Sequence, residues 1–138
     1  MSDSLSNLFS HIQNSQKNRT LTIFCNFTKL FVSILETLQE NGYIRGYRII
    51  QNNKPHTNNK PMLAILLKYK NQKPAIKKFI RISKPSKRVY ICSQKHLSTP
   101  APVSLMQGLF ILSTSHGILS NIEASKLNIG GEILGQVW

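Results

Sequence analysis

The sequence contains few acidic residues. Only 5 Asp and Glu stand against 18 Lys and Arg among 138 residues, which gives a formal net charge of +13. The hydrophobic fraction of 41% is ordinary for a folded chain and excludes a disordered basic tail. Positive charges in this excess repel one another, so the sequence predicts a polyanionic partner. Nucleic acid is favoured over a membrane surface.

Other features are missing as well. No apolar run approaches the roughly 18 residues that a membrane-spanning helix needs. The first residues have no basic segment followed by an apolar core, so we expect no secretory signal, and they do not resemble an Arg-rich import peptide. Cys25 and Cys92 match no metal spacing and are predicted to be reduced, partly buried thiols. The four histidines show no ligand spacing either, so the sequence predicts neither a metal nor a cofactor.

The basic residues are concentrated in the middle of the chain. No acidic side chain occurs between Glu40 and Glu123, a stretch of 82 residues that contains 14 of the 18 basic ones. These charges cannot pair within the stretch, so they are either solvated or neutralised by phosphate groups of a partner. They are Arg45, Arg48, Lys54, Lys60, Lys68, Lys70, Lys73, Lys77, Lys78, Arg81, Lys84, Lys87, Arg88 and Lys95.

Hydrophobic periodicity predicts an α+β lobe over residues 1–82. Apolar residues spaced at i, i+3, i+4 and i+7 predict a helix over 4–16, and a wider apolar stripe predicts a second over about 27–41, capped by Asn26 or Thr28 and followed by Gly42 at the left-handed position. Residues 17–25 are predicted to be a loop or a short extended piece. Alternating residues then predict strands near 43–50, 62–70 and 76–82, which would form a three-stranded antiparallel meander beneath the two helices. The polar segment 51–61 is predicted to be a turn or hairpin loop.

A second lobe over residues 88–138 is predicted to be mainly β, after a linker over 83–87. Short strands are expected at 88–92, at 108–112 and at the end of the chain, with irregular structure at 93–104. Ser120 and Glu123 form a capping-box pattern, which predicts a short helix over about 121–127. The fold class is therefore α+β with two small lobes.

Three candidate binding features lie in this second region. Ser113-Thr114-Ser115 places three hydroxyls at the end of a strand, where they can bind phosphates, 2′-hydroxyls or base edges. Tyr90, beside the basic Lys87 and Arg88, can stack on a base or pack across the sheet. Glu132 can accept hydrogen bonds from a base, or it can simply hold a turn.

Catalysis is the alternative for the hydroxyls. Ser113 or Ser115 would need a base and a group to orient it, and adjacent His116 alone does not supply both. Because the whole chain has only five carboxylates, we predict that the protein is not an enzyme.

The segments, taken in order, resemble the bacterial-type small-subunit ribosomal protein S8 family. The resemblance covers essentially the whole chain and is most specific in the C-terminal half. The residues that carry it are Ile82-Ser83-Lys84-Pro85, Arg88-Val89-Tyr90, Ile111-Leu112-Ser113-Thr114-Ser115 with Gly117, Glu123-Ala124, Lys126-Leu127, Gly130-Gly131-Glu132-Ile133-Leu134 and Val137-Trp138.

The resemblance implies a structural, rRNA-binding component of the small ribosomal subunit that supports assembly. Its partners would be the central domain of small-subunit rRNA and neighbouring ribosomal proteins, with no membrane and no small-molecule substrate. The contacts carried over by match are Ser113, Thr114, Ser115, Tyr90 and Glu132. The basic residues Lys84, Lys87 and Arg88, in and beside the linker, would add phosphate contacts.

The sequence departs from the family pattern at several positions. Ser86 stands where glycine is usual, Gly135-Gln136 stands where a Cys-Tyr pair is common, and the usual basic residues of the first helix are replaced around His11 and Gln13. Lys outnumbers Arg by 13 to 5, which suits an AT-rich genome and suggests an organelle-encoded member, mitochondrial rather than plastid, with a bacterial protein as the alternative. A regulator that represses its own messenger is the other RNA-binding possibility.

Overall fold

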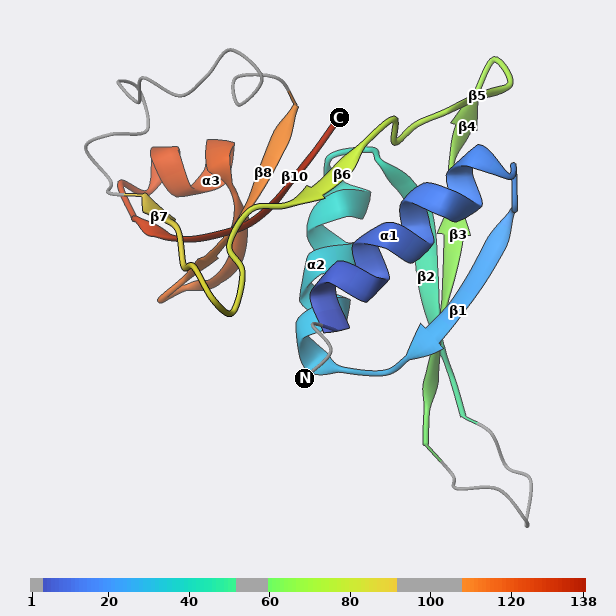
Figure 1. The fold of residues 1–138 in the computed structure, drawn as a ribbon, viewed down its shortest axis with the longest axis horizontal. Coiled ribbons are helices and arrows are strands. Elements are labelled where there is room, and N and C mark those ends of the chain that lie inside the picture. The colour runs from blue at the N-terminus through green and yellow to red at the C-terminus, as the bar shows by residue number, and fades with distance from the viewer. Residues whose placement is uncertain (1–3, 52–59, 92–107) are drawn as a thin grey trace.

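A computed structural model describes residues 4–51, 60–91 and 108–138 (Figure 1). Residues 52–59 of the predicted loop 51–61, the whole predicted irregular segment 93–104 and Cys92 lie outside the described residues. In chain order the elements are α1 (Ser4–Lys17), β1 (Thr22–Asn26), α2 (Lys29–Glu40), β2 (Ile44–Ile50), β3 (Met62–Leu67), β4 (Tyr69–Lys70), β5 (Lys73–Pro74), β6 (Phe79–Arg81), β7 (Tyr90–Ile91), β8 (Leu109–Thr114), β9 (Gly117–Ser120), α3 (Asn121–Lys126) and β10 (Gly131–Val137). This mixed content confirms the α+β fold class. None of the helices within these ranges is long and apolar enough to cross a membrane.

The first sheet is antiparallel and has the strand order β1-β3-β2. Its central strand, β3, places Leu63, Ile65 and Leu67 in the core, all three with at most 1% of their surface exposed. Helix α2 packs beside this sheet, and the Tyr47 hydroxyl on β2 donates to Glu36 of the helix over 2.9 Å. The prediction of a three-stranded antiparallel sheet is confirmed, but one of its strands comes from a different segment.

The third strand of this sheet is Thr22–Asn26, a segment that the sequence predicts to be a loop or a short extended piece. The segment predicted to fill that place, near 76–82, forms β6 instead and pairs with β10 of the other sheet. Ile76 and Phe79 are the buried apolar residues of this segment, and the Phe79 ring stacks on Phe9 of α1 with the centroids 3.8 Å apart. This packing and the pairing with β10 hold the segment in the second sheet instead of beside β3.

The second sheet has the order β6-β10-β8-β9, and β7 also pairs with β10. Strand β10 is its centre: Val137 lies opposite Phe79 of β6 at one end, and Glu132 lies opposite Tyr90 of β7 at the other. Strand β8 runs along its other edge, with a register shift between Ile133 and Gly135.

The predicted helix ends are largely confirmed. The Thr28 hydroxyl accepts a hydrogen bond from the Phe31 amide at the start of α2, and Ser120 accepts one from the Glu123 amide at the start of α3. Gly42 follows α2 with φ +79°, a conformation that favours glycine.

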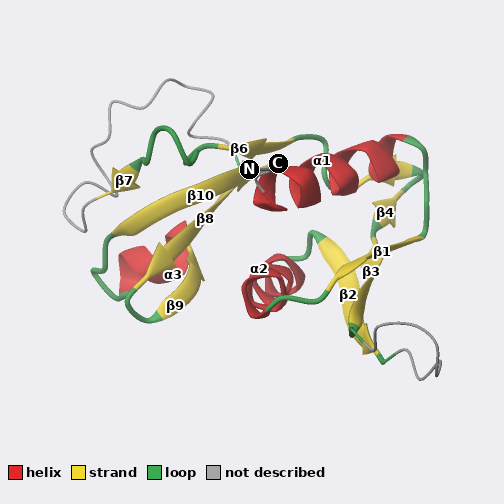
Figure 2. Ribbon diagram, turned by 60° about the horizontal axis from the view of Figure 1, so that its bottom comes forward, coloured by secondary structure: helices red, strands yellow, loops and turns green. Residues whose placement is uncertain are grey.

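The two sheets share one hydrophobic core. Helix α2 lies between them and contacts both β2 and β9 (Figure 2). Phe9 of α1 stacks on Phe79 of β6, with ring centroids 3.8 Å apart, and the same core includes Leu134 and Val137 of β10. Residues 79–81 therefore connect α1 to the second sheet, while the lobe boundaries at 82 and 88 remain a prediction.

Candidate nucleic-acid interface

Strand pairing brings three predicted residues into one row. Glu132 of β10 lies directly opposite Tyr90 of β7 on one side and opposite Ser113 of β8 on the other. Residues paired in this way share a face of the sheet, with Cβ atoms about 5 Å apart. Leu112, which precedes Ser113 and points to the opposite face, is completely buried. The row Tyr90–Glu132–Ser113 therefore lies on the more open face.

Gly131 allows strands β8 and β10 to approach closely beside this row. A Cβ at this position would collide with the Ser113 carbonyl, so a larger residue would push the two strands apart. The double glycine before Glu132 therefore includes a position required for packing, and the local sequence alone did not indicate this.

The three hydroxyls continue from the row into the turn between β8 and β9. Thr114 donates to the Gly117 carbonyl over 2.8 Å and accepts from the His116 amide over 3.2 Å, so its hydroxyl is engaged in holding the turn. Ser115 is exposed, and its hydroxyl oxygen lies 3.2 Å from the Nδ1 atom of His116. Ser113 is half-buried, and its hydroxyl forms no hydrogen bond with another described residue. The turn thus presents Ser113 and Ser115, while Thr114 supports it.

The contact between Ser115 and His116 does not form a catalytic arrangement. Within the described part of the chain, no carboxylate hydrogen-bonds the His116 ring to orient it, as a hydrolytic triad requires. Likewise, no group of three or more His, Cys, Asp or Glu residues in the described ranges could hold a metal ion. Cys25 is a free, half-buried thiol, as predicted, and burial raises its pKa.

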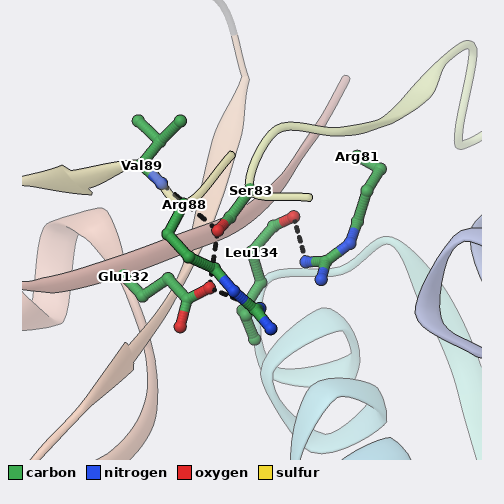
Figure 3. A network of polar contacts seen from close by, with 6 residues as sticks. All are labelled: Arg81, Ser83, Arg88, Val89, Glu132 and Leu134. Carbon is green, nitrogen blue, oxygen red and sulfur yellow. Dashed lines mark hydrogen bonds and ion pairs between the residues drawn. The ribbon is translucent and has the colours of Figure 1, made fainter. Parts of the chain in front are cut away.

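Glu132 is the centre of a polar network (Figure 3). Its Oε1 atom accepts a hydrogen bond from the Ser83 hydroxyl at 2.5 Å and an ion-paired hydrogen bond from the Arg88 guanidinium at 3.0 Å. The Ser83 hydroxyl also accepts from the Val89 amide over 3.3 Å. These contacts lower the pKa of Glu132, chiefly through the Ser83 hydrogen bond and also through Arg88, although burial acts in the opposite direction.

The predicted linker is a closed turn. The backbone amides of Lys84 and Lys87 each donate to the other residue's carbonyl, over 2.9 and 3.0 Å. Both lysines are exposed, as is Arg88, so the turn holds three cations at the edge of the row. Ser83 at its base is 0% exposed.

Sequence reasoning missed two supporting residues. Ser83 connects the turn to Glu132, and Arg81 donates to the Leu134 carbonyl over 2.9 Å, which ties β6 to β10. A serine within Ser-Lys-Pro-Ser-Lys is typical of an exposed turn, so no local signal indicated that Ser83 is buried.

The arrangement combines neutral hydroxyls, an exposed aromatic ring and exposed cations on one edge of a sheet. Tyr90 leaves 69% of its surface exposed. Hydroxyls and a ring of this kind bind 2′-hydroxyls and bases, and lysines bind phosphates. This chemistry suits a structured RNA.

Comparison with known proteins points the same way. The family model described as Ribosomal protein S8 matches residues 3–138. The Small ribosomal subunit protein uS8 of Rhodospirillum centenum is 38% identical over 138 residues, covering 100% of this chain and 98% of the relative. Proteins of the same name from Granulibacter bethesdensis and Ureaplasma parvum are 38% and 37% identical over 138 and 137 residues, again covering 98% of each relative. The similarity therefore extends across both sheets.

Proposed function

The chain belongs to the ribosomal protein S8 family, and we propose that it binds the central domain of the small-subunit rRNA and supports assembly of the subunit. As a member of this family it is a non-catalytic, structural component of the small ribosomal subunit. The observation that carries the proposal is the row of Tyr90, Glu132 and Ser113, which three separate strands bring together beside a hydroxyl-bearing turn.

Recognition is assigned to the uncharged groups. The wide minor groove of an RNA helix displays 2′-hydroxyls and base edges, which both donate and accept hydrogen bonds. The Ser113 and Ser115 hydroxyls match that chemistry, and the exposed Tyr90 ring can stack on a sugar or a base that leaves a distorted helix. Glu132 acts mainly as the carboxylate that fixes Ser83 and Arg88 beside them.

Affinity comes mainly from the cations. Lys84 and Lys87 project from a closed turn at the edge of the row, where they can neutralise phosphates without a fixed hydrogen-bond geometry. Binding that depends on such charges releases counterions and weakens as salt rises.

Replacing the Ser113 and Ser115 hydroxyls tests the proposal. Ser113→Ala combined with Ser115→Ala is expected to weaken binding to a central-domain rRNA transcript by at least about 1 kcal/mol, roughly fivefold in Kd, because hydrogen bonds to the RNA can no longer form. Filter binding measures this effect against a regular RNA duplex of equal length. The matched control is Ser10→Ala combined with Ser33→Ala, two helix serines on α1 and α2. Equal weakening on the transcript and the duplex contradicts shape-specific recognition.

We also propose an organelle-encoded member, mitochondrial rather than plastid. Lys exceeds Arg by 13 to 5, as an AT-rich genome favours. The relatives described above are bacterial, which is compatible with the alternative of a bacterial cytoplasmic protein. Finding the gene in nuclear, organellar or bacterial DNA of the source organism decides between them.

A further inference from the structure

A second cluster of cations lies on the short β4–β5 hairpin and at the residue just before it. Lys68, Lys70 and Lys73 surround a pocket of about 470 Å³, which is completed by Gly42, Tyr43, Asn71, Pro74 and Ala75. The hairpin and the β7–α3 region lie at opposite ends of the molecule in both views (Figures 1 and 2). This pocket is therefore separate from the row of Tyr90, Glu132 and Ser113.

The hairpin is held in place from its other face. The Tyr69 hydroxyl donates to the Thr20 carbonyl over 2.6 Å and lies 3.4 Å from the Ser15 carbonyl at the end of α1. Because side chains alternate along a strand, Lys70 of β4 points away from Tyr69. Lys73 pairs directly with Lys70 and shares its face. Lys68, just before β4, lines the same pocket, so all three lysines border it.

The tip of the hairpin has a defined shape. Asn71 and Gln72 both have positive φ, of 52° and 63°, the combination that closes a two-residue hairpin of type I′. On the pocket's opposite wall, Gly42 follows α2, and a Cβ there would lie 3.6 Å from the Lys68 Nζ atom. The carbonyl end of α2 carries partial negative charge, which favours an ammonium group at this point.

No carboxylate forms an ion pair with these three lysines within the described part of the chain. The ion pair between Arg88 and Glu132 lies in the other sheet. Glu40, the acidic residue nearest to Gly42 in sequence, is exposed and forms no described ion pair with these lysines. Three like charges around one pocket repel each other unless an anion enters.

We propose that this pocket binds a phosphate of the rRNA backbone, in a stretch of RNA other than the one at the β7–β8–β10 row. The ligand class is a phosphodiester, because the pocket is lined by three lysines but has no row of groups positioned to recognise a particular base. This inference rests on the proposed function. It adds a second point of attachment at the opposite end of the chain.

The test replaces the three lysines without changing their approximate length. The hairpin variant is Lys68→Gln, Lys70→Gln and Lys73→Gln, and a Lys→Arg variant at the same positions keeps the charge. The matched control is Lys29→Gln, Lys60→Gln and Lys126→Gln, which removes the same charge from three exposed lysines elsewhere. Binding to the full-length small-subunit rRNA transcript is measured over a salt series, and amide NMR follows a titration with inorganic phosphate.

Three results are expected together if the pocket binds an rRNA phosphate. The hairpin variant binds the transcript more weakly than the control variant, and the Lys→Arg variant binds like the unaltered chain. The ratio of the hairpin variant's Kd to that of the unaltered chain is expected to fall between roughly 50 and 200 mM salt. The fall is about threefold for each phosphate that the variant no longer neutralises. Inorganic phosphate shifts the Gly42 and Asn71 amide signals of the unaltered chain but not those of the hairpin variant.

Equal binding by the hairpin and control variants overturns the proposal, and phosphate-induced shifts without any effect on RNA binding overturn the assignment to rRNA. These results are distinguishable from failure of the proposed function. In that case the unaltered chain does not prefer the rRNA transcript to an unrelated RNA of equal length, whatever the phosphate titration shows.

Discussion

Replacing Ser83 by alanine is predicted to loosen the β7 edge of the candidate interface. The side chain is fully buried, donates to Glu132 over 2.5 Å and accepts from the Val89 amide over 3.3 Å. Alanine removes both hydrogen bonds. It leaves a carboxylate with one fewer donor and an amide without its acceptor.

The expected decrease is about 2 to 3 kcal/mol in the free energy of unfolding, because hydrogen bonds to charged groups contribute about 1.5–3 kcal/mol. Urea denaturation at neutral pH measures it, and an unchanged slope with urea indicates that the unfolding reaction is the same. Ser86→Ala is the control, since Ser86 is exposed in the same turn. A decrease below about 0.5 kcal/mol would refute the reasoning, since it is within the range of ordinary surface substitutions.

The same network predicts a pH dependence. The pKa of Glu132 is lower in the folded chain than its ordinary value of 4.5, so the ionised carboxylate stabilises the fold. This contribution is fully present above the unfolded pKa and is lost as pH falls through the folded pKa. The stability difference between the unaltered chain and Glu132→Gln is therefore constant near neutral pH and shrinks below about pH 4.5. A difference that grows on acidification contradicts the described hydrogen bonds.

Three further substitutions test packing, capping and recognition. Gly135→Ala would place a Cβ 2.6 Å from a ring carbon of Phe9, so we expect a destabilisation of about 1–3 kcal/mol by thermal denaturation, whereas Gly46→Ala, with its nearest neighbour at 3.8 Å, stays close to neutral. Thr28→Ala removes the cap of α2 and should cost about 1 kcal/mol in urea denaturation. Tyr90→Ala should weaken binding to the central-domain transcript by about 1–3 kcal/mol without lowering Tm, because its ring is exposed, and Tyr90→Phe should retain most of the affinity. A fall in Tm for Tyr90→Ala would instead indicate a packing role.

Local signals were sufficient for the helices. Periodicity predicts α1 and α2 within a few residues of their observed bounds, and Ser120 and Thr28 cap their helices as expected. These features depend on residues three to four positions apart, which the sequence displays directly.

Strand partners could not be predicted in the same way. Residues 79–81 have the pattern of a third strand in a local meander, but they pair with β10, more than 50 positions away. Thr22–Asn26 takes the place beside β3 because Ile23 contributes a buried apolar side chain to the helix-covered core. Pairing between distant segments depends on the packing of the whole core, which no short window of sequence contains.

The candidate site shows the same division. Its residue types followed from chemistry and from resemblance to a family, but the register that aligns Tyr90, Glu132 and Ser113 follows from three strands far apart in the sequence. The roles of Ser83 and Gly131 follow from close approaches made only when those strands meet.

Hydroxyl-radical footprinting on the full-length small-subunit rRNA tests the central claim most directly. The unaltered chain is expected to protect a helix of the central domain, and the variant Tyr90→Ala, Ser113→Ala and Ser115→Ala is expected to lose that protection. The control Ser10→Ala and Ser33→Ala should retain it. Protection that survives in the triple variant, or that spreads evenly over the whole RNA, would contradict recognition by this edge of the second sheet.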